Sequence, residues 1–312
     1  MKGFGYWHNT AMLAFAVHGG AGAIRRERLS AQNEGRYRAG LSAALDRGFG
    51  LLEEGASSLD AVTAAVRILE DDPLFNAARG AALTREGRAE LDASIMDGRE
   101  QRAGAIASVR HIRNPIDLAR RVMEKSRHVL ITGEGAEEFA LQEGMTLVAN
   151  DYFRTSERKE QLRRQLEGES VSELVPAQGT VGAVALDARG DLAAATSTGG
   201  MTLKRQGRVG DSAVIGAGTY AKNGVCAVSA TGHGEYFIRA VAAYHVCAAL
   251  EYRGLTLMQA VHEVLHEKIR TLGGEGGIIA VDAQGHIVMD FSSQTMFRAA
   301  RDSNGKREVA VF

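Results

Sequence analysis

The stretch PAQGTVGAVALD at positions 176–187 decides how the whole chain is interpreted. A polar, charge-rich segment stops at Gly179 and Thr180, and a run of small and β-branched residues typical of a strand follows at once. A loop that leads into a strand would produce this pattern. A new chain terminus made at Thr180 would produce it as well, and the rest of the sequence must separate these alternatives.

The composition is that of an ordinary globular protein. The chain has 312 residues, 45% of them hydrophobic and 24% charged, with a formal net charge of -1. This balance argues against a nucleic-acid partner, and no apolar run reaches the roughly 20 residues of a membrane helix. The start of the sequence lacks a signal-peptide pattern, and Cys226 and Cys247 lie among apolar residues. We therefore expect a cytoplasmic protein with buried thiols.

Hydrophobic periodicity predicts alternating strands and helices in the first half of the chain. A buried strand at 12–17 leads into the glycine-rich turn HGGAG at 18–22. Ser57 or Ser58 is expected to cap the second helix. The expected segments are helices at 36–55, 57–73, 116–126 and 133–144, and strands at 87–98, 102–111 and 128–132.

The region 151–178 is dense in charge and poor in large apolar residues, so we expect a mobile connector or a partly helical exposed arm. Beyond it, the segments 181–200 and 276–293 both place Asp-Ala-x-Gly between apolar runs, which predicts two hairpins. Helices are expected between them, at 234–254 and 256–271. This order fits a sheet layer covered by helices.

The segment VHEVLHEK matches the zinc-peptidase pattern, with His262 and His266 one helical turn apart and Glu263 beside them. A catalytic zinc needs a third protein ligand, and no extended form of the motif follows. Glu275 lies just beyond a glycine pair, with no helix to hold it. We interpret the pattern as the polar face of an amphipathic helix.

Thr180 has a chemical reason to become a chain terminus. A threonine hydroxyl is a poor nucleophile without a base, and the α-amine of an N-terminal threonine supplies one with a pKa of about 7.7–8.0. Gly179 has no Cβ and can adopt strained conformations that expose its carbonyl to the hydroxyl. A long connector could then leave the site after cleavage.

Residues downstream of Thr180 supply what such a nucleophile needs. Thr196, Ser197 and Thr198 end the return strand of the same hairpin. Arg208 and Asp211 lie three residues apart on a glycine-rich loop. The guanidinium of Arg208 is suited to bind a carboxylate, and the carboxylate of Asp211 is suited to bind an ammonium group. Together they suit the head group of a free amino acid.

The segment SATGHGEYF ends a strand and opens a helix through a turn. Its turn residues are Thr231, Gly232 and Gly234. Backbone N–H groups at such a turn can form an oxyanion hole.

The ordered motifs GTVGAVALD, LAAATSTGGMT, GRVGDS, GAGTYA and ATGHGE, preceded by HGGAG and PLFNA, resemble the plant-type asparaginase/isoaspartyl aminopeptidase family of N-terminal-nucleophile hydrolases. The resemblance covers about residues 12–298. It implies an α+β fold, a four-layer αββα sandwich in one domain spanning 1–312, and an (αβ)₂ assembly. It also implies self-cleavage into an α chain of residues 1–179, with the connector at about 151–179, and a β chain of residues 180–312.

The resemblance assigns roles to individual residues. Thr180 would be the nucleophile and Thr198 its hydrogen-bond partner. Arg208 would hold the substrate α-carboxylate and Asp211 its α-amino group. The remaining assignments are Thr231 and Gly232 to the oxyanion hole, Gly234 to the pocket lining, Asn76 to a position beside the nucleophile, and His18, Gly19 and Gly20 to the turn that packs on the cleavage site.

The resemblance further implies a structural sodium ion held by backbone carbonyls in the loop 69–79, with no cofactor for catalysis. The carbonyls would be those of Leu69, Glu70, Asp72, Phe75, Ala77 and Arg79. Ala78 stands where many relatives have glycine, and its Cβ should resist a positive φ and alter this loop.

The expected activity is hydrolysis of isoaspartyl dipeptides and of L-asparagine. One alternative is a glycosylasparaginase-type amidohydrolase, whose members are usually exported. The second is a zinc peptidase through His262 and His266, and the third is a binding or scaffold protein that keeps the fold without processing. The expected partners are small molecules, with no nucleic acid and no membrane.

Overall fold

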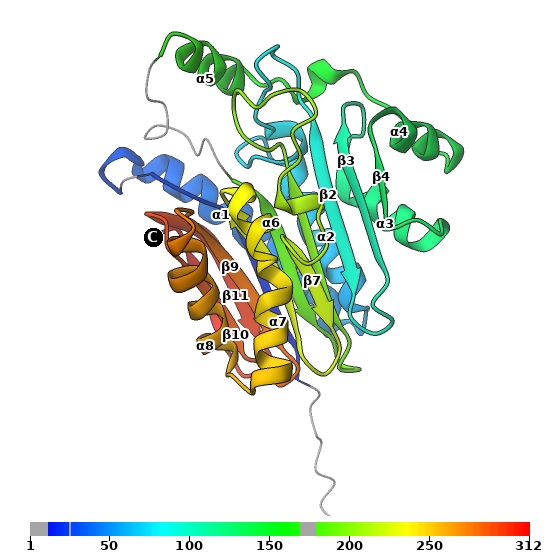
Figure 1. Cartoon of the computed structure of the whole chain (residues 1–312), viewed down its shortest axis with the longest axis vertical. Helices are drawn as coiled ribbons and strands as arrows, with labels where there is room; N and C mark the ends of the chain where they lie inside the picture. Colours follow the sequence, from blue (N-terminus) through cyan, green and yellow to red (C-terminus); the bar gives the residue numbers. More distant parts are fainter. Residues whose placement is uncertain (1–11, 25, 169–178) are drawn as a thin grey trace, which may run out of the picture.

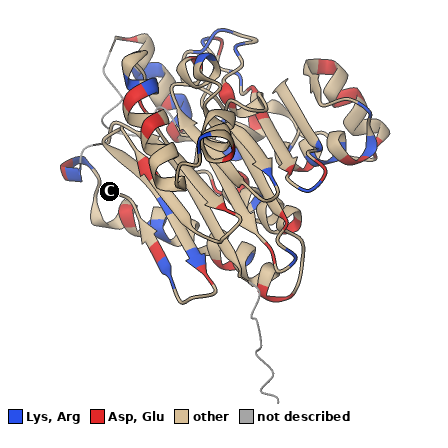
Figure 2. Ribbon diagram, turned by 60° about the horizontal axis from the view of Figure 1, so that its bottom comes forward, with Lys and Arg blue, Asp and Glu red and all other residues tan. Residues whose placement is uncertain are grey.

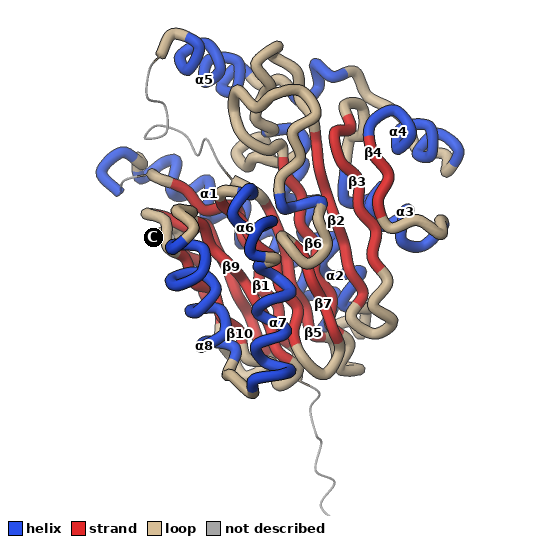
Figure 3. The backbone as a smooth tube through the Cα atoms, in the orientation of Figure 1, coloured by secondary structure: helices blue, strands red, loops and turns tan. Residues whose placement is uncertain are grey.

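Two β-sheets packed face to face form the centre of the structure, and helices cover both outer faces (Figures 1 and 3). The computed structural model describes residues 12–24, 26–168 and 179–312. Helix, sheet, sheet and helix are the four layers of an αββα sandwich, so the fold predicted from the sequence is confirmed.

The larger sheet has eight strands in the order β12-β11-β1-β5-β6-β2-β3-β4. Its neighbouring strands pair antiparallel, except β3 and β4, which are parallel. The strands are β1 (Ala14–Gly22), β2 (Leu91–Asp97), β3 (Ala103–Val109), β4 (Leu130–Thr132), β5 (Val181–Leu186), β6 (Leu192–Thr198), β11 (Thr295–Asp302) and β12 (Arg307–Ala310).

The smaller sheet is antiparallel, in the order β10-β9-β8-β7. Its strands are β7 (Thr219–Lys222), β8 (Cys226–Gly232), β9 (Gly276–Asp282) and β10 (Ile287–Phe291). The helices on this side are α6 (Gly234–Ala240), α7 (Ala242–Arg253) and α8 (Leu257–His262), and those on the side of the larger sheet are α1 (Ala31–Glu53), α2 (Ser58–Asp71), α3 (Pro115–Lys125) and α4 (Gly133–Gln142).

Strand β1 illustrates how the sequence specifies the layers. Successive side chains of a strand point to opposite faces. Ala14 and Ala16 belong to the apolar cluster between the two sheets, whereas Phe15 and Val17 belong to the cluster under the outer helices. Small residues on the inner face let the sheets approach closely, and large residues on the outer face fill the space beneath the helices.

Both predicted hairpins are present, because β5 pairs with β6 and β9 pairs with β10. Ser57 caps α2 by accepting a hydrogen bond from the Asp60 amide. The prediction of a single helix at 234–254 is wrong in one respect. The helix breaks at Val241, whose φ of 49° lies in the left-handed region. The next helix also changes character, since α8 continues as a π-helix, η5 (Glu263–Ile269).

The region predicted as a connector is partly helical where the structure describes it. A 3-10 turn, η3 (Asn150–Phe153), is followed by helix α5 (Ser156–Leu166). Arg158 of α5 is buried, and its Nε donates to the Gly80 carbonyl at 2.6 Å, which docks this arm on the rest of the protein. Residues 169–178 lie outside the described residues.

Charged residues concentrate on helices and connecting loops, while the strands are mostly uncharged (Figure 2). Helix α5 and its C-cap residue carry charges of both signs, including Glu160, Arg163 and the capping Glu167. Among the helices that the structure describes, none combines the length and apolar character required to cross a membrane.

Glu70 is a buried carboxylic acid between the helix layer and the larger sheet. Its Oε1 accepts hydrogen bonds from Ser197 Oγ at 2.6 Å and from the Ile116 amide at 2.9 Å. Burial raises the pKa of Glu70 from 4.5 to about 8, and the bond from Ser197 offsets this only in part. Glu70 is therefore protonated at neutral pH in the folded protein.

We predict that the stability of Glu70→Gln falls less between pH 5 and pH 9 than the stability of the wild type. The folded state holds this proton more tightly than the unfolded state does. The stabilisation is complete below the unfolded pKa and is lost as the pH rises through about 8. At about 1.4 kcal/mol per pKa unit, the part of the unfolding free energy that is lost through Glu70 is at most about 5 kcal/mol. Melting temperatures of both proteins at pH 5 and pH 9 measure it, and parallel pH profiles would contradict the assignment.

Candidate active site

The hydroxyls of Thr180 and Thr198 lie side by side at one end of the β5–β6 hairpin. Val181 pairs with Ser197 in this hairpin, so the residue before β5 falls next to the last residue of β6. Thr180 Oγ1 donates to Thr198 Oγ1 at 3.1 Å, and both side chains are buried. The two threonines thus meet as the hairpin predicted.

Asn76 fixes the turn that follows β6. Its Nδ2 donates to the Gly200 carbonyl at 2.7 Å, and its backbone carbonyl accepts from the Gly199 amide at 3.0 Å. The Gly200 amide in turn donates to Thr198 Oγ1 at 3.0 Å. Asn76 also lies beside Gly179, since a Cβ on that glycine would be 3.7 Å from the Asn76 Cβ. Asn76 therefore positions Thr198 through the backbone of the turn.

The turn predicted at residues 18–22 is wrong, because this glycine-rich segment continues strand β1, with a bulge between His18 and Gly20. The segment packs directly on the bond between residues 179 and 180. Gly20 has a φ of 109°, and a Cβ on it would lie 2.5 Å from the Gly179 Cα and 3.2 Å from the Thr180 nitrogen. Gly19 is equally constrained, because its Cβ would be 2.3 Å from the ring of Phe75. Only glycine at position 20 lets the two backbones touch.

His18 is the first residue of this segment, and its side chain points into the interior. Its Nε2 is 3.0 Å from Ser229 Oγ, and the side chain is fully buried. Burial lowers the pKa of His18 to about 3, so the imidazole is neutral at physiological pH. His18 therefore has a structural place beneath Thr180.

Thr231 holds the backbone nitrogen of Thr180. Its Oγ1 accepts hydrogen bonds from the Thr180 amide at 3.3 Å and from the Ala21 amide at 3.2 Å. Because the hydroxyl accepts both bonds, its own proton stays available for donation. The next residue, Gly232, has a φ of 150°, and a Cβ there would lie 2.5 Å from the Glu275 carbonyl.

Asp211 is a buried carboxylate with an unused oxygen. Its side chain is 3% exposed, and among the described residues Oδ2 has no hydrogen-bond partner. Burial raises the pKa of Asp211 to about 7, although the charge of Arg208 acts in the opposite direction. Gly234 leaves room for this pair, since a Cβ there would be 2.8 Å from Asp211 Oδ1 and 3.1 Å from Arg208 Nη2. Such a carboxylate is suited to receive an ammonium group.

Arg208 is held by a residue that the sequence did not single out. Its Nε and Nη2 donate to the two carboxylate oxygens of Glu235, each at 2.9 Å. This two-bond pair uses one edge of the guanidinium and leaves Nη1 for another anion. Glu235 is the last residue of the motif ATGHGE. No local pattern in the sequence predicts that it pairs with Arg208.

Thr180, Thr198, Arg208, Asp211 and Gly232 all line one small cavity. Its volume is about 10 Å³, enough for about one water molecule. Gly179 forms part of the wall. The uncleaved chain therefore brings the predicted residues together but leaves no space for an amino acid.

A much larger cavity, of about 1070 Å³, lies elsewhere, between α7, α8 and the turn that joins β9 to β10. None of the residues predicted for the site lines it. Its size alone does not identify it as the functional site.

The expectation that His262 and His266 lack a third ligand is wrong. Asp290 of β10 reaches both rings from the neighbouring strand. Glu263, the general base of a zinc peptidase, instead pairs with Arg253 at 2.6 Å. The residues do not line the cavity at Thr180, and the pair lacks the base that peptide hydrolysis would need.

The loop predicted to hold sodium keeps a positive φ despite the Cβ of Ala78, whose φ is 41°. The resistance expected of this Cβ does not exclude the conformation, which carries a steric strain at a residue other than glycine. The carbonyls of Phe75 and Pro73 both point at Gly80, 2.1 Å and 2.5 Å from where its Cβ would be. Backbone therefore packs tightly against Gly80, and only a glycine fits at this position of the loop.

Residues 11–311 match the sequence model of a protein family described as asparaginase. The chain is 53% identical to an isoaspartyl peptidase of Escherichia coli K12, over 91% of each chain. It is 42% identical to an isoaspartyl peptidase/L-asparaginase of Mus musculus, over 96% of this chain and 90% of that protein. It is 40% identical to a probable isoaspartyl peptidase/L-asparaginase 2 of Arabidopsis thaliana, over 96% and 98%.

We predict that Gly20→Ala destabilises the protein more than Gly190→Ala, in chains that also carry Thr180→Ala to keep the backbone continuous. Both glycines have positive φ, so both substitutions carry a strain of about 1–3 kcal/mol. Only the Cβ at position 20 also meets backbone atoms, since nothing lies within 4 Å of one at 190. Thermal unfolding measures the difference, and equal losses would exclude the contact with Gly179.

Proposed function

The chain belongs to this asparaginase family, and we propose that it is a self-cleaving threonine hydrolase that acts on isoaspartyl dipeptides and on L-asparagine. One observation carries the assignment. Thr180 and Thr198 are hydrogen-bonded in the same cavity that Arg208 and Asp211 line. A nucleophile thereby lies beside groups suited to the head group of an aspartyl residue.

Self-cleavage is the first reaction that we propose. Thr180 Oγ attacks the Gly179 carbonyl, the peptide C–N bond breaks, and the hydroxyl proton passes to the nitrogen, which becomes an amine. Water then hydrolyses the resulting ester, giving chains 1–179 and 180–312. The contact of Gly20 with this bond and the closed cavity both support this order of events.

Turnover uses the amine that cleavage creates. The α-amine takes the proton of Thr180 Oγ, which attacks the side-chain carbonyl of the substrate. Thr231, whose hydroxyl accepts from the Thr180 amide, would donate its proton to the developing oxyanion, together with backbone N–H groups near Gly232. An amine or ammonia leaves, and water hydrolyses the β-aspartyl ester to release aspartate.

Substrate binding follows from the charges around the cavity. The free edge of Arg208 would receive the α-carboxylate, and Asp211 Oδ2 would receive the α-ammonium. The ammonium would also stabilise the ionised form of Asp211, whose pKa burial raises to about 7. Thr198 would orient the hydroxyl of Thr180.

Three further properties are proposed. The family resemblance implies an (αβ)₂ assembly and a structural sodium ion in the loop 69–79. A cytoplasmic location is proposed from the start of the sequence and from the two buried cysteines, Cys226 and Cys247. A glycosylasparaginase activity has no specific support here, since the relatives named above are isoaspartyl peptidases and asparaginases.

We predict that the purified protein separates into two fragments, 1–179 and 180–312, on a denaturing intact-mass measurement. Thr180→Ala should stay a single chain, because it has no nucleophile. Thr180→Ser keeps a hydroxyl and should still cleave, at a lower rate. A wild-type chain that stays intact after long incubation would refute self-cleavage. Cleavage at another bond would refute Thr180 as the nucleophile.

We also predict that Glu235→Ala raises KM for L-asparagine by about tenfold, while kcat changes less than twofold. Glu235 holds Arg208 in place and does not touch the reacting atoms. A tenfold change corresponds to about 1.4 kcal/mol. Glu251→Ala is the matched control, because Glu251 pairs with Lys222 away from the cavity. A lower KM would mean that Glu235 competes with the substrate carboxylate for Arg208.

A further inference from the structure

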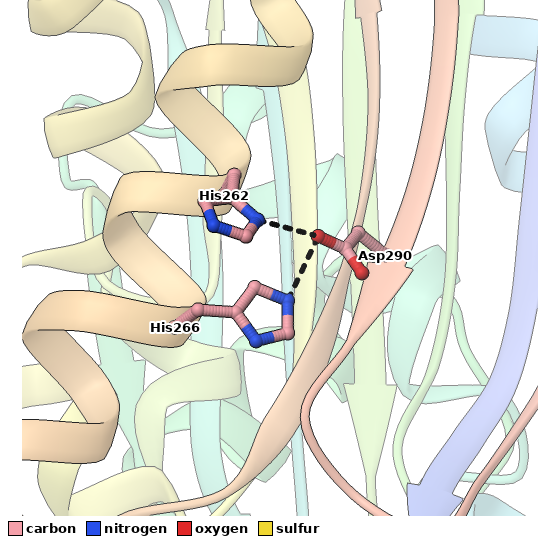
Figure 4. A group of neighbouring side chains, drawn as sticks. All are labelled: His262, His266 and Asp290. Atoms are coloured by element: carbon pink, nitrogen blue, oxygen red, sulfur yellow. Dashed lines mark hydrogen bonds and ion pairs between the residues drawn. The ribbon is translucent and has the colours of Figure 1, made fainter.

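A second group of convergent side chains lies on the outer side of the smaller sheet, apart from the Thr180 cavity. We define the His–His–Asp cluster as His262, His266 and Asp290 (Figure 4). His262 ends α8, and His266 follows one turn later in the π-helix η5. Asp290 belongs to β10, an edge strand of the smaller sheet. The cluster therefore joins a helix to a strand edge that lies open to solvent.

The distances within the cluster approach those of a metal site. His266 Nε2 lies 3.0 Å from Asp290 Oδ2, and His262 Nδ1 lies 4.0 Å from the same oxygen. The three ligand atoms lie within 4.8 Å of one another. Ligands at about 2.0–2.1 Å from a tetrahedral zinc are about 3.4 Å apart, so small rotations of the exposed side chains would close the site.

The carboxylate is already oriented for this purpose. The Phe291 amide donates to Asp290 Oδ1 at 2.8 Å, which leaves Oδ2 directed at the imidazoles. Partners of this kind fix the orientation of metal ligands in proteins. Arg298, whose charge also acts on Asp290, donates instead to the carbonyls of Met296 and Phe312.

An ion pair between His266 and Asp290 explains only part of the arrangement. Their spacing of one helical turn brings the rings of His262 and His266 together, with centroids 4.5 Å apart and planes 29° from parallel. Both imidazoles therefore face the carboxylate, although the ion pair needs only one of them. His262 is 61% exposed, and among the described residues it has no closer polar partner than Asp290. Two imidazoles facing one carboxylate are typical of a site for a divalent metal.

We propose that the His–His–Asp cluster binds a divalent transition metal, with zinc as the best fit, and that water completes the coordination. Neutral imidazole and carboxylate are common zinc ligands. The metal would cross-link the end of α8 to the edge strand β10 and so stabilise this layer. It takes no part in the reaction at Thr180, because none of its ligands lines that cavity.

Calorimetric titration of the untagged, full-length protein with zinc chloride tests the proposal. The expected result is saturable binding of one ion per chain and a higher melting temperature with zinc. His262→Gln and Asp290→Asn should each weaken binding by about tenfold or more. Cobalt(II) should give the visible absorption of a tetrahedral site in the wild type only.

His286→Gln is the matched control. His286 pairs with Asp282 at 2.8 Å but has no second imidazole beside it, so this change should leave zinc binding intact. Absence of binding, or equal losses in the control and the cluster variants, would overturn the proposal. Unchanged binding in Asp290→Asn would overturn the three-ligand site. L-Asparagine hydrolysis should persist in EDTA, which separates failure of this site from failure of the proposed function.

Discussion

The antiparallel register of β5 and β6 is the constraint on which the site depends. Pairing of Val181 with Ser197 places Thr180 beside Thr198. A slip of one residue would turn every side chain of the strand to the opposite face. The register is secured from both sides, because Ser197 bonds to Glu70 in the helix layer while Thr196 bonds to Ser229 in the other sheet.

A chain of buried hydroxyls extends this constraint between the sheets. His18 Nε2 lies 3.0 Å from Ser229 Oγ, which is 2.7 Å from Thr196 Oγ1. Thr196 Oγ1 accepts from Thr219 at 2.6 Å, and Ser94 donates to Thr219 at 2.7 Å. These contacts connect β1, β8, β6, β7 and β2 below the cavity. A buried network whose members are paired rigidifies its surroundings, so the reactive residues rest on a stiff base.

The parts of the molecule that were predictable from sequence depend on local patterns. Both hairpins have a turn signature in sequence, and the nearness of Thr180 and Thr198 follows once the first hairpin forms. The bond between Glu235 and Arg208, the approach of Asp290 to the histidines, and the docking of Arg158 on Gly80 join distant segments. No short pattern in the sequence predicts them. The break at Val241 was missed because the apolar spacing continues unbroken through it, while the backbone takes a left-handed conformation.

The size of the cavity at Thr180 has a consequence for when activity can appear. A space for one water molecule has no room for an amino acid. Under the proposed self-cleavage, the continuous chain would be a latent form that folds before it can bind substrate. Cleavage of the bond between residues 179 and 180 would open the pocket. This reaction would be intramolecular, so its rate would not depend on protein concentration. The chain would then behave as a zymogen that needs no activating protease. Each molecule would reach its active state independently of its neighbours.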